Sequence, residues 1–234
     1  MKRLKADLHL HTSDDPCDQI DYSAEMLIDA VAENGLDVMA ITCHTTVIFN
    51  EYLADYARQR GVLLIPAAEL NIEEKHVLLL NPDADQARAT TFAELRRLGK
   101  RDAAIIAPHA YFPIGSALGR KLAENIDLFD AIEYHSFYNR IINCNRKAKR
   151  TARKHGLPMV GSTDTHTLPY DPSTYTWIEA EPTVPSIINA IRSGRIGVET
   201  RPRSFSQILD VLRFSFSQEL RDRRPTSKHS EATQ

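Results

Sequence analysis

The sequence predicts an α/β fold built from parallel strand–helix units. Strand, helix, strand, helix and strand alternate within the first 69 residues of the 234-residue chain. This alternation is typical of parallel βα units. An α/β barrel of this length folds as one domain, and 42% hydrophobic residues can supply a sizeable core. We therefore expect a single domain over residues 1–217.

The first half of the chain gives one clear helix start. Ser23 is the N-cap candidate, because a serine side chain accepts a hydrogen bond from a free amide of the first turn. The apolar face of this helix comprises Met26, Leu27, Ala30 and Val31, and Gly35 ends the helix. The other elements expected here are strands at 6–12, 36–42 and 62–68, the last reaching Glu69, a helix at 50–60 and an apolar run at 77–80.

The second half continues the alternation with shorter elements. We expect helices at 91–98, 146–155 and 185–192, and strands at 103–107, 131–135, 157–162, 177–179 and 196–198. The helix at 146–155 is very basic, and Gly156 follows it. Residues 218–234 have no apolar period, so we expect a disordered tail there.

Composition excludes several classes of protein. The formal net charge of −2 gives no overall field that would favour nucleic acid or membrane. The chain has only three cysteines, too few and too scattered for a disulfide framework or a zinc ribbon. No apolar run approaches the roughly 18 residues of a membrane span, and no signal peptide is evident. We expect a soluble, cytoplasmic protein with reduced thiols.

The first strand holds two histidines in alternation with apolar residues. In Ala6-Asp7-Leu8-His9-Leu10-His11-Thr12 the period of two puts His9 and His11 on one face. Two imidazoles about 7 Å apart along a strand can bind one metal ion. A polar edge strand that happens to contain two histidines is the alternative.

Polar residues recur where the predicted strands end. These positions are His9, His11, His44, Glu69, His109, His135, Asp164 and His166. Six of the nine histidines belong to this set. Side chains at the C-terminal ends of barrel strands meet in one site. A single such histidine is usually a satisfied core residue, but this recurrence predicts a multinuclear metal site.

The ligand types indicate the metals and the reaction class. Imidazoles with carboxylates suit zinc, manganese or iron. Glu69 can bridge two metals, since each of its oxygens can bind one. Two metals about 3.5 to 4 Å apart can hold a hydroxide nucleophile and stabilise an in-line displacement. We expect metal-assisted hydrolysis, most plausibly at phosphorus.

Four segments resemble the PHP family, the polymerase and histidinol phosphatase domain. They are Asp7-Leu8-His9-Leu10-His11-Thr12, Gly35-Leu36-Asp37-Val38-Met39-Ala40-Ile41-Thr42-Cys43-His44, Ala107-Pro108-His109, and Gly161-Ser162-Thr163-Asp164-Thr165-His166. The resemblance covers residues 6 to about 200. It implies a distorted (β/α)7 TIM-like barrel, a trinuclear site at the C-terminal strand ends and phosphoester hydrolysis.

The resemblance also implies three ligand sets, with two to three divalent ions (Zn, Mn or Fe) as cofactors. They are His9, His11, Glu69 and Asp164 for one metal, Glu69, His76 and His109 for a second, and His44, His166 and a loop residue for a third. We choose Asp15 as that loop residue, with Asp14 and Asp18 as competitors. Glu69, Asp164 and His109 are the expected catalytic residues.

One departure from the family pattern concerns Cys43, which stands where an aspartate is common. A carboxylate there would orient ligands, so Cys43 could weaken or retune one metal, or itself be a soft ligand.

We assign His135 to substrate, with a structural hydrogen bond as the alternative. Arg120 and Arg140 are the other substrate-binding candidates, because arginine grips phosphate bidentately. Lys121 lies beside Arg120.

Three functions follow from these observations. The leading one is a phosphoesterase that hydrolyses a small phosphorylated metabolite or nucleotide through a metal-activated hydroxide. A nuclease-like activity that trims short oligonucleotides is the second, supported by the basic helix at 146–155, although such a run is usually a solvated face. The third is a non-catalytic metal-binding regulatory domain. We expect no membrane partner, and the sequence gives no oligomeric state.

Overall fold

The computed structural model describes residues 2–204, which form one nine-stranded sheet with helices around it. The strands are β1 Lys2–Leu10, β2 Val38–Ile41, β3 Leu63–Ile72, β4 Lys75–Leu80, β5 Ala104–Ala107, β6 Ala131–His135, β7 Met159–Ser162, β8 Thr174–Ala180 and β9 Ile196–Thr200. The α-helices are α1 Ala24–Glu33, α2 Glu51–Gln59, α3 Phe92–Leu98, α4 Arg120–Glu124, α5 Asn145–His155 and α6 Val184–Arg192. Short 3₁₀ helices lie at η1 Gln86–Arg88 and η2 Ile126–Leu128. The predicted tail at 218–234 is outside the described residues.

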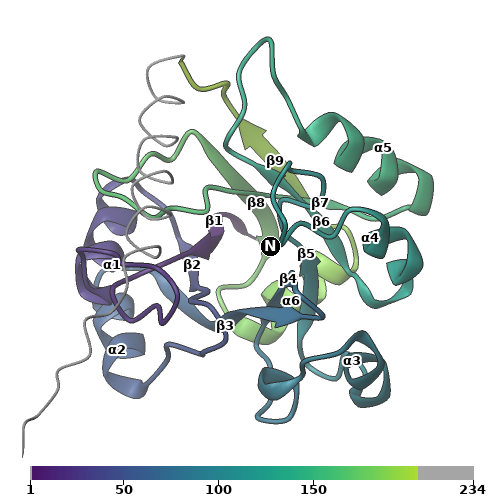
Figure 1. Cartoon of the computed structure of the whole chain (residues 1–234). Helices are drawn as coiled ribbons and strands as arrows, with labels where there is room; N and C mark the ends of the chain where they lie inside the picture. Colours follow the sequence, from purple (N-terminus) through teal and green to yellow (C-terminus); the bar gives the residue numbers. More distant parts are fainter. Residues whose placement is uncertain (1, 205–234) are drawn as a thin grey trace, which may run out of the picture.

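The sheet curls into a nearly closed barrel (Figure 1). β1, β2 and β3 are parallel, as are β5, β6 and β7, and β4 runs antiparallel between the two groups. The ring closes where the Asp164 amide donates to the His9 carbonyl (3.0 Å) and the His11 amide to that of Thr165 (3.2 Å). These bonds set the segment after β7 beside the end of β1.

The predicted mixed α/β barrel is therefore confirmed, with a different strand count. β8 pairs antiparallel with the first part of β1, and β9 pairs antiparallel with β8. Strands were expected at 177–179 and 196–198, and in the structure they form an antiparallel hairpin at the seam between β1 and β7, so that the sheet has nine strands instead of the seven of the barrel that the resemblance implies.

Gly161 permits the close packing of β7 against this added hairpin. A Cβ atom at Gly161 would lie 2.7 Å from the Tyr175 carbonyl oxygen and 2.8 Å from Val198 Cγ1. The Gly161 amide and carbonyl both bond to the Thr176 hydroxyl, at 2.9 and 2.8 Å. A larger residue would push the strands apart where the barrel closes.

Three hydrophobic clusters hold the barrel together. Inside it, Leu4, Leu8 and Val38 pack with the isoleucines of α6. Arg192 of α6 donates to the Ala103 carbonyl just before β5, so α6 covers the N-terminal end of the barrel. The two outer clusters pack α1 and α2 on one side and α3 to α5 on the other. The opposite, C-terminal end is thus left for polar side chains.

The first two helices begin at the N-cap residues that the sequence indicates, but one residue of the predicted apolar face of α1 is exposed. The Ser23 hydroxyl accepts from the Met26 amide, and Asn50 caps α2 in the same way. Met26, however, was wrongly placed on the apolar face, because its side chain is 52% exposed and the buried position is Ile28. No helix among residues 2–204 is long and apolar enough to cross a membrane.

The strand at Glu69 is longer than predicted. β3 continues to Ile72 and turns through Glu73 and Glu74 into β4. In this antiparallel hairpin His76 lies opposite Asn71, two residues from Glu69. Glu69 and His76 therefore share one face, because side chains alternate along a strand. Glu69 lies inside a strand rather than at its end.

Candidate metal centre

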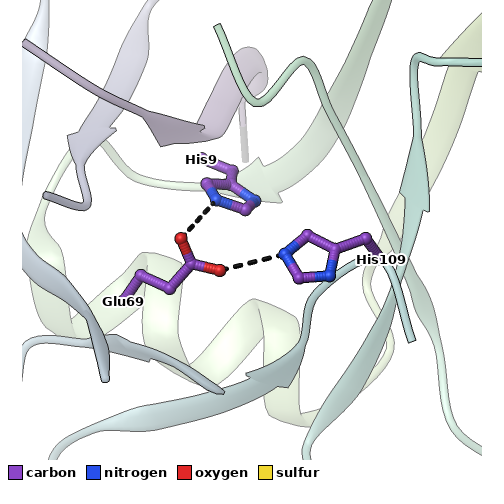
Figure 2. Close-up of side chains that lie close together, drawn as sticks. All are labelled: His9, Glu69 and His109. Atoms are coloured by element: carbon purple, nitrogen blue, oxygen red, sulfur yellow. Dashed lines mark hydrogen bonds and ion pairs between the residues drawn. The ribbon is translucent and has the colours of Figure 1, made fainter. Parts of the chain in front are cut away.

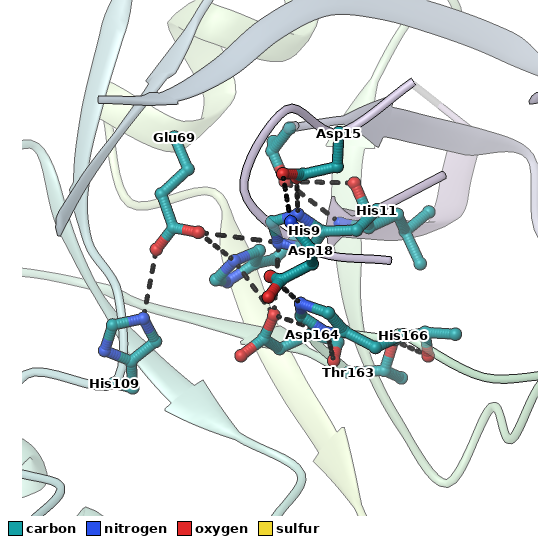
Figure 3. Close-up of polar contacts among 12 residues, drawn as sticks. His9, His11, Asp15, Asp18, Glu69, His109, Thr163, Asp164 and His166 are labelled. Atoms are coloured by element: carbon teal, nitrogen blue, oxygen red, sulfur yellow. Dashed lines mark hydrogen bonds and ion pairs between the residues drawn. The ribbon is translucent and has the colours of Figure 1, made fainter. Parts of the chain in front are cut away.

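The sequence-predicted ligands converge at the C-terminal end of the barrel (Figure 3). His9 and His11 end β1 or follow it, His44 follows β2, Glu69 and His76 lie on the β3–β4 hairpin, His109 follows β5, and Asp164 and His166 follow β7. Asp15 and Asp18 belong to the loop after β1. The structure thus brings together all nine residues proposed as metal ligands.

Glu69 lies between two sets of histidines, and Figure 2 shows one histidine of each set. One oxygen, Oε2, faces His9 (3.3 Å), His11 (3.4 Å) and His44 (3.3 Å). The other, Oε1, faces His76 (2.8 Å) and His109 (3.0 Å). The side chain is buried. A carboxylate with one oxygen toward each set has the arrangement of a bridge between two metal ions.

Four donor atoms around the first set have the spacing of one tetrahedral site. His9 Nε2 and His11 Nε2 both lie 3.2 Å from Asp164 Oδ1. The same nitrogens lie 3.3 and 3.4 Å from Glu69 Oε2. Tetrahedral ligands with bonds of about 2.1 Å to zinc would be about 3.4 Å apart. The spacing therefore fits a metal ion.

Several of these buried atoms have no hydrogen-bond partner within residues 2–204. Three of them face the cluster, namely His11 Nε2, His76 Nδ1 and Asp164 Oδ1, whereas the fourth, His109 Nδ1, is the ring nitrogen that does not face Glu69. His76 Nδ1 lies 2.8 Å from a Glu69 oxygen, yet the pair lacks hydrogen-bond geometry. Because buried polar atoms normally find partners, lone pairs that approach without bonding are the signature of donors aimed at an ion. The residues fit divalent metals.

Two further carboxylates fix the orientation of the first histidines. Glu133 accepts from His9 Nδ1 at 2.8 Å, and Asp15 accepts from His11 Nδ1 at 2.8 Å. Since the Nδ1 atoms hold the protons, the Nε2 lone pairs face Glu69 and Asp164. Glu133 also accepts from Ser162 Oγ (2.6 Å) and from the His109 amide. Glu133 was not among the predicted site residues, although it lies on the same face of β6 as His135.

The loop after β1 offers two carboxylates to the third set. Asp15 accepts from the His44 amide (2.9 Å) and faces His44 Nδ1 (3.0 Å). Asp18 faces His166 Nε2 at 3.1 Å and His44 Nδ1 at 3.5 Å. Asp14 is exposed and bonds to Thr12. Asp15 and Asp18 thus both remain candidates for the loop ligand, and Asp14 does not reach the cluster.

The two cysteines near this set differ in exposure. Cys43 is buried, and its Sγ lies 3.4 Å from the Thr12 hydroxyl. Burial raises the pKa of the Cys43 thiol to about 11. The Cys43 sulfur also lies within 4.8 Å of donor atoms of His11 and Asp15, so its position is compatible with a packing role and with a soft metal ligand. Cys17 is exposed, and its sulfur lies within 4.8 Å of donor atoms of Asp15 and His44.

His135 touches the cluster through Asp164. The Phe137 amide donates to His135 Nδ1 (2.9 Å), so Nε2 holds the ring proton of the neutral imidazole. That Nε2 donates to Asp164 Oδ2 at 3.1 Å. In this state His135 offers no lone pair to a metal, which agrees with its assignment to substrate or to a structural bond.

The predicted arginines lie outside the cluster. Arg120 and Arg140 are exposed, and within the described part of the chain neither bonds to a cluster residue. Arg203 is closer and was missed. Its guanidinium is mostly buried and donates to Ser136 Oγ at 3.0 Å, beside His135. Only tertiary packing of the segment after β9 brings it there.

The charged side chains of the cluster shift one another's pKa values. Burial raises the pKa of Glu69, but the charges of His9 and His76 outweigh it and hold that pKa well below its usual range. Burial lowers the pKa of His166, whereas Asp164 and Asp18 raise it to about 9. Without metal the histidines and carboxylates therefore stabilise one another's charges.

Two residues of the cluster have unusual backbone angles. His109 has φ of 28° and Asp164 has φ of 54°, values in or near the left-handed region that non-glycine residues rarely adopt. Such conformations gather at functional sites, because the surrounding structure must hold them. Here they turn both side chains toward Glu69 and His9.

Comparisons with known proteins found one matching family model and one curated relative. A model of the family described as PHP-associated matches residues 143–196. An uncharacterised protein of Methanocaldococcus jannaschii, MJ1587, is 26% identical over 147 residues, which cover 58% of this chain and 84% of that protein.

Two solved structures share the fold. One is a two-domain protein from Bacteroides vulgatus that contains a predicted PHP-like metal-dependent phosphoesterase, with a TM-score of 0.65, 18% identity and coverage of 93% of this chain and 70% of that one. The other is the lesion-specific endonuclease PfuEndoQ of Pyrococcus furiosus, with a TM-score of 0.60, 14% identity and coverage of 90% and 66%. The match to the PHP-associated family model agrees with the resemblance of the strand-end motifs to the PHP family, and the solved structures show that the fold is shared.

Proposed function

We propose that the chain is a metal-dependent phosphoesterase. The observation that supports this most directly is Glu69, whose two oxygens face separate sets of histidines. The Bacteroides vulgatus protein of the same fold is described as containing a PHP-like phosphoesterase. The substrate is a small phosphorylated metabolite or nucleotide.

Three ions would be held by the sets named from the resemblance. They are His9, His11, Glu69 and Asp164; then Glu69, His76 and His109; and then His44, His166 and Asp15 or Asp18. Bound zinc, manganese or iron would supply Lewis acidity at the phosphoryl oxygens and lower the pKa of water. We assign Glu69, Asp164 and His109 to the catalytic machinery.

The surrounding side chains orient this machinery. Glu133 and Asp15 hold the Nδ1 protons of His9 and His11, so that each Nε2 lone pair faces inward. The Nε2–H group of His135 donates a hydrogen bond to Asp164, and it can donate to a substrate oxygen instead when a substrate binds. Hydrolysis adds the oxygen of water to phosphorus, breaks the bond from phosphorus to the alcohol oxygen and gives that oxygen a proton.

The test combines metal content with turnover. Full-length protein purified without added metal should contain about two to three equivalents of zinc, manganese or iron, and should hydrolyse p-nitrophenyl phosphate or its bis ester. Glu69→Gln should lower the metal content and reduce kcat/KM by more than about 100-fold, beyond the cost of losing an outer-shell residue. Exposed Glu179→Gln on β8 is the matched control and should change neither quantity.

Unchanged turnover in Glu69→Gln would contradict the mechanism. Metal bound at the expected stoichiometry without hydrolysis of any phosphoester would instead favour the non-catalytic metal-binding domain.

A further inference from the structure

The positive charge of the chain is concentrated in one stretch. Residues 140–154, which include the end of the loop after β6 and most of α5, contain no acidic residue. Their exposed cations are Arg140, Arg146, Lys147, Lys149, Arg150, Arg153 and Lys154. None of these forms an ion pair with another residue between 2 and 204, whereas Arg58 of α2 and Arg96 of α3 each pair with an aspartate. Because the whole chain has a net charge of −2, the remainder has an excess of negative charge.

Two exposed isoleucines lie within this basic stretch. Ile141 is 85% exposed and Ile142 is 65% exposed, more than any other large apolar side chain among residues 2–204. The Asn139 side chain accepts from the amides of both, at 2.8 and 2.7 Å, and the Asn139 amide donates to the Ile142 carbonyl at 2.9 Å. A hydrogen-bonded turn therefore presents the isoleucines outward. We call the exposed side chains of residues 140–154 the basic surface.

The other side of the barrel has the opposite charge. Helix α1 contains three acidic residues and no basic one, and α2 contains two acidic residues and a single arginine. Figure 1 shows α1 and α2 on the left of the sheet and α5 on the right. The small net charge of the chain thus hides two regions of opposite sign, with the barrel between them.

Apolar side chains are exposed on the acidic side as well. Met26 of α1 is 52% exposed and Tyr52 of α2 is 60% exposed. The rings of Tyr52 and Tyr56 lie 6.0 Å apart, and the Tyr56 hydroxyl donates to Asp29 of α1 at 3.0 Å. The two helices therefore present one joint face. Since residues three or four apart share a helix face, this acidic surface comprises Met26, Asp29, Glu33, Tyr52 and Asp55.

We propose that the chain binds a second copy of itself head to tail, with the basic surface of one copy against the acidic surface of the next. Both surfaces combine charges with exposed apolar side chains, and their charges are complementary. A two-fold pairing of either surface with itself would bring like charges together, which costs free energy. Unlike surfaces are therefore the favoured partners.

The position of the two surfaces determines the kind of assembly. Because they lie on opposite sides of the barrel, one copy cannot make both contacts with the same partner. Each copy would instead contact two neighbours, one through each surface. A heterologous contact of this kind builds a ring if the rotation closes and a filament if it does not. This inference is independent of the proposed phosphoesterase activity.

The first measurement is sedimentation velocity of the full-length, metal-loaded protein at increasing protein concentration. In low salt the weight-average sedimentation coefficient should rise with protein concentration. In about 0.5 M NaCl it should rise much less, because the Debye length falls to about 4 Å. A monomer at every protein concentration in low salt would overturn the proposal.

Two charge-reversal variants test the pairing of unlike surfaces. The basic-surface variant combines Arg146→Glu with Arg150→Glu, and the acidic-surface variant combines Glu33→Lys with Asp55→Lys. All four side chains are exposed, so circular dichroism and Tm should show that both variants fold. Each variant alone should sediment as a monomer. An equimolar mixture should again form a complex, because each variant keeps the surface that the other has lost.

Other results would contradict head-to-tail pairing. Self-association of the acidic-surface variant alone would show that the basic surface pairs with itself or with another part of the chain. Monomers in the equimolar mixture would show that the two surfaces are not partners. Either result would overturn the proposal.

A matched variant controls for the change in net charge. Arg88→Glu combined with Arg97→Glu reverses two exposed arginines of η1 and α3, outside both surfaces. This control has the same net charge as the basic-surface variant and should self-associate as the parent protein does. An equal loss of association in both variants would mean that net charge alone governs association, and would overturn the proposal.

Discussion

At the scale of single residues, the centre depends on carboxylates that need not touch a metal. Glu133 is fully buried and accepts from His9, Ser162 and the His109 amide. Burial raises its pKa, but His9 lowers it to about 2, so the carboxylate remains charged. Its charge and its acceptors decide which His9 nitrogen faces the cluster.

Glu133→Gln should therefore weaken metal binding. The amide can accept one proton but can also present its own N–H groups to His9, which allows the ring to flip. We expect a 10- to 100-fold loss of metal affinity, the usual cost of an outer-shell change, measured by competition with a chromogenic chelator. Exposed Glu179→Gln is again the control, and equal affinities in the two variants would contradict this role.

A second residue-scale prediction concerns thiol reactivity. The thiolate is the reactive form, and burial raises the pKa of Cys43 to about 11. The thiolate fraction of Cys43 grows only as the pH approaches 11. At pH 8 nearly all of the Cys43 thiol is protonated, so iodoacetamide should not label it. Exposed Cys17 should react there, and peptide mapping distinguishes the two. Fast labelling of Cys43 in a Cys17→Ser variant would show that it is accessible.

At the scale of elements, local sequence patterns predicted where the strands lie but not how the strands pair. The alternation of His9 and His11 with leucines, and the apolar runs before His44, His109 and Asp164, located the strands and one edge of the cluster. The same alternation contains Glu133, which was overlooked. The hairpin that brings His76 beside Glu69 could not be read from its short apolar run, because its antiparallel register depends on the turn at Glu73 and Glu74.

Gly161→Ala tests the packing of β7 against the added hairpin. The new Cβ would lie 2.7 Å from the Tyr175 carbonyl, a backbone atom that cannot rotate away. We expect destabilisation of about 1–3 kcal/mol, measured by urea unfolding. Gly115→Ala is the control, because a Cβ there meets nothing within 4 Å. Equal stability of the two variants would mean that β7 is free to move outward.

At the scale of the whole molecule, the cluster gathers ligands from most of the chain. The nine proposed ligands come from six strands or the loops that follow them, and they meet at one end of the barrel. Contacts such as that of Arg203 with Ser136 depend on the complete fold, which explains why the sequence pattern gave no indication of an arginine beside His135.

Removal of metal should consequently destabilise the entire fold. A ligand that binds only the native state adds RT ln(1 + [L]/Kd) to its stability. We expect chelation to lower Tm by several degrees and metal to restore it, with Tm rising as the concentration of free metal increases. Scanning calorimetry measures both, and a Tm that does not change on chelation of metal-containing protein would contradict this expectation.

The seam between β1 and β7 is where a bound metal would stabilise the closed barrel. His9 and His11 stand at one margin of the seam and Asp164 at the other, separated by most of the domain's length but joined by backbone bonds. An ion bound by these three side chains would hold β1 against the segment that follows β7. The ion would act like a cross-link that closes a long loop, and would stabilise the closed barrel relative to an open sheet. The side chains proposed to take part in catalysis would therefore also stabilise the fold.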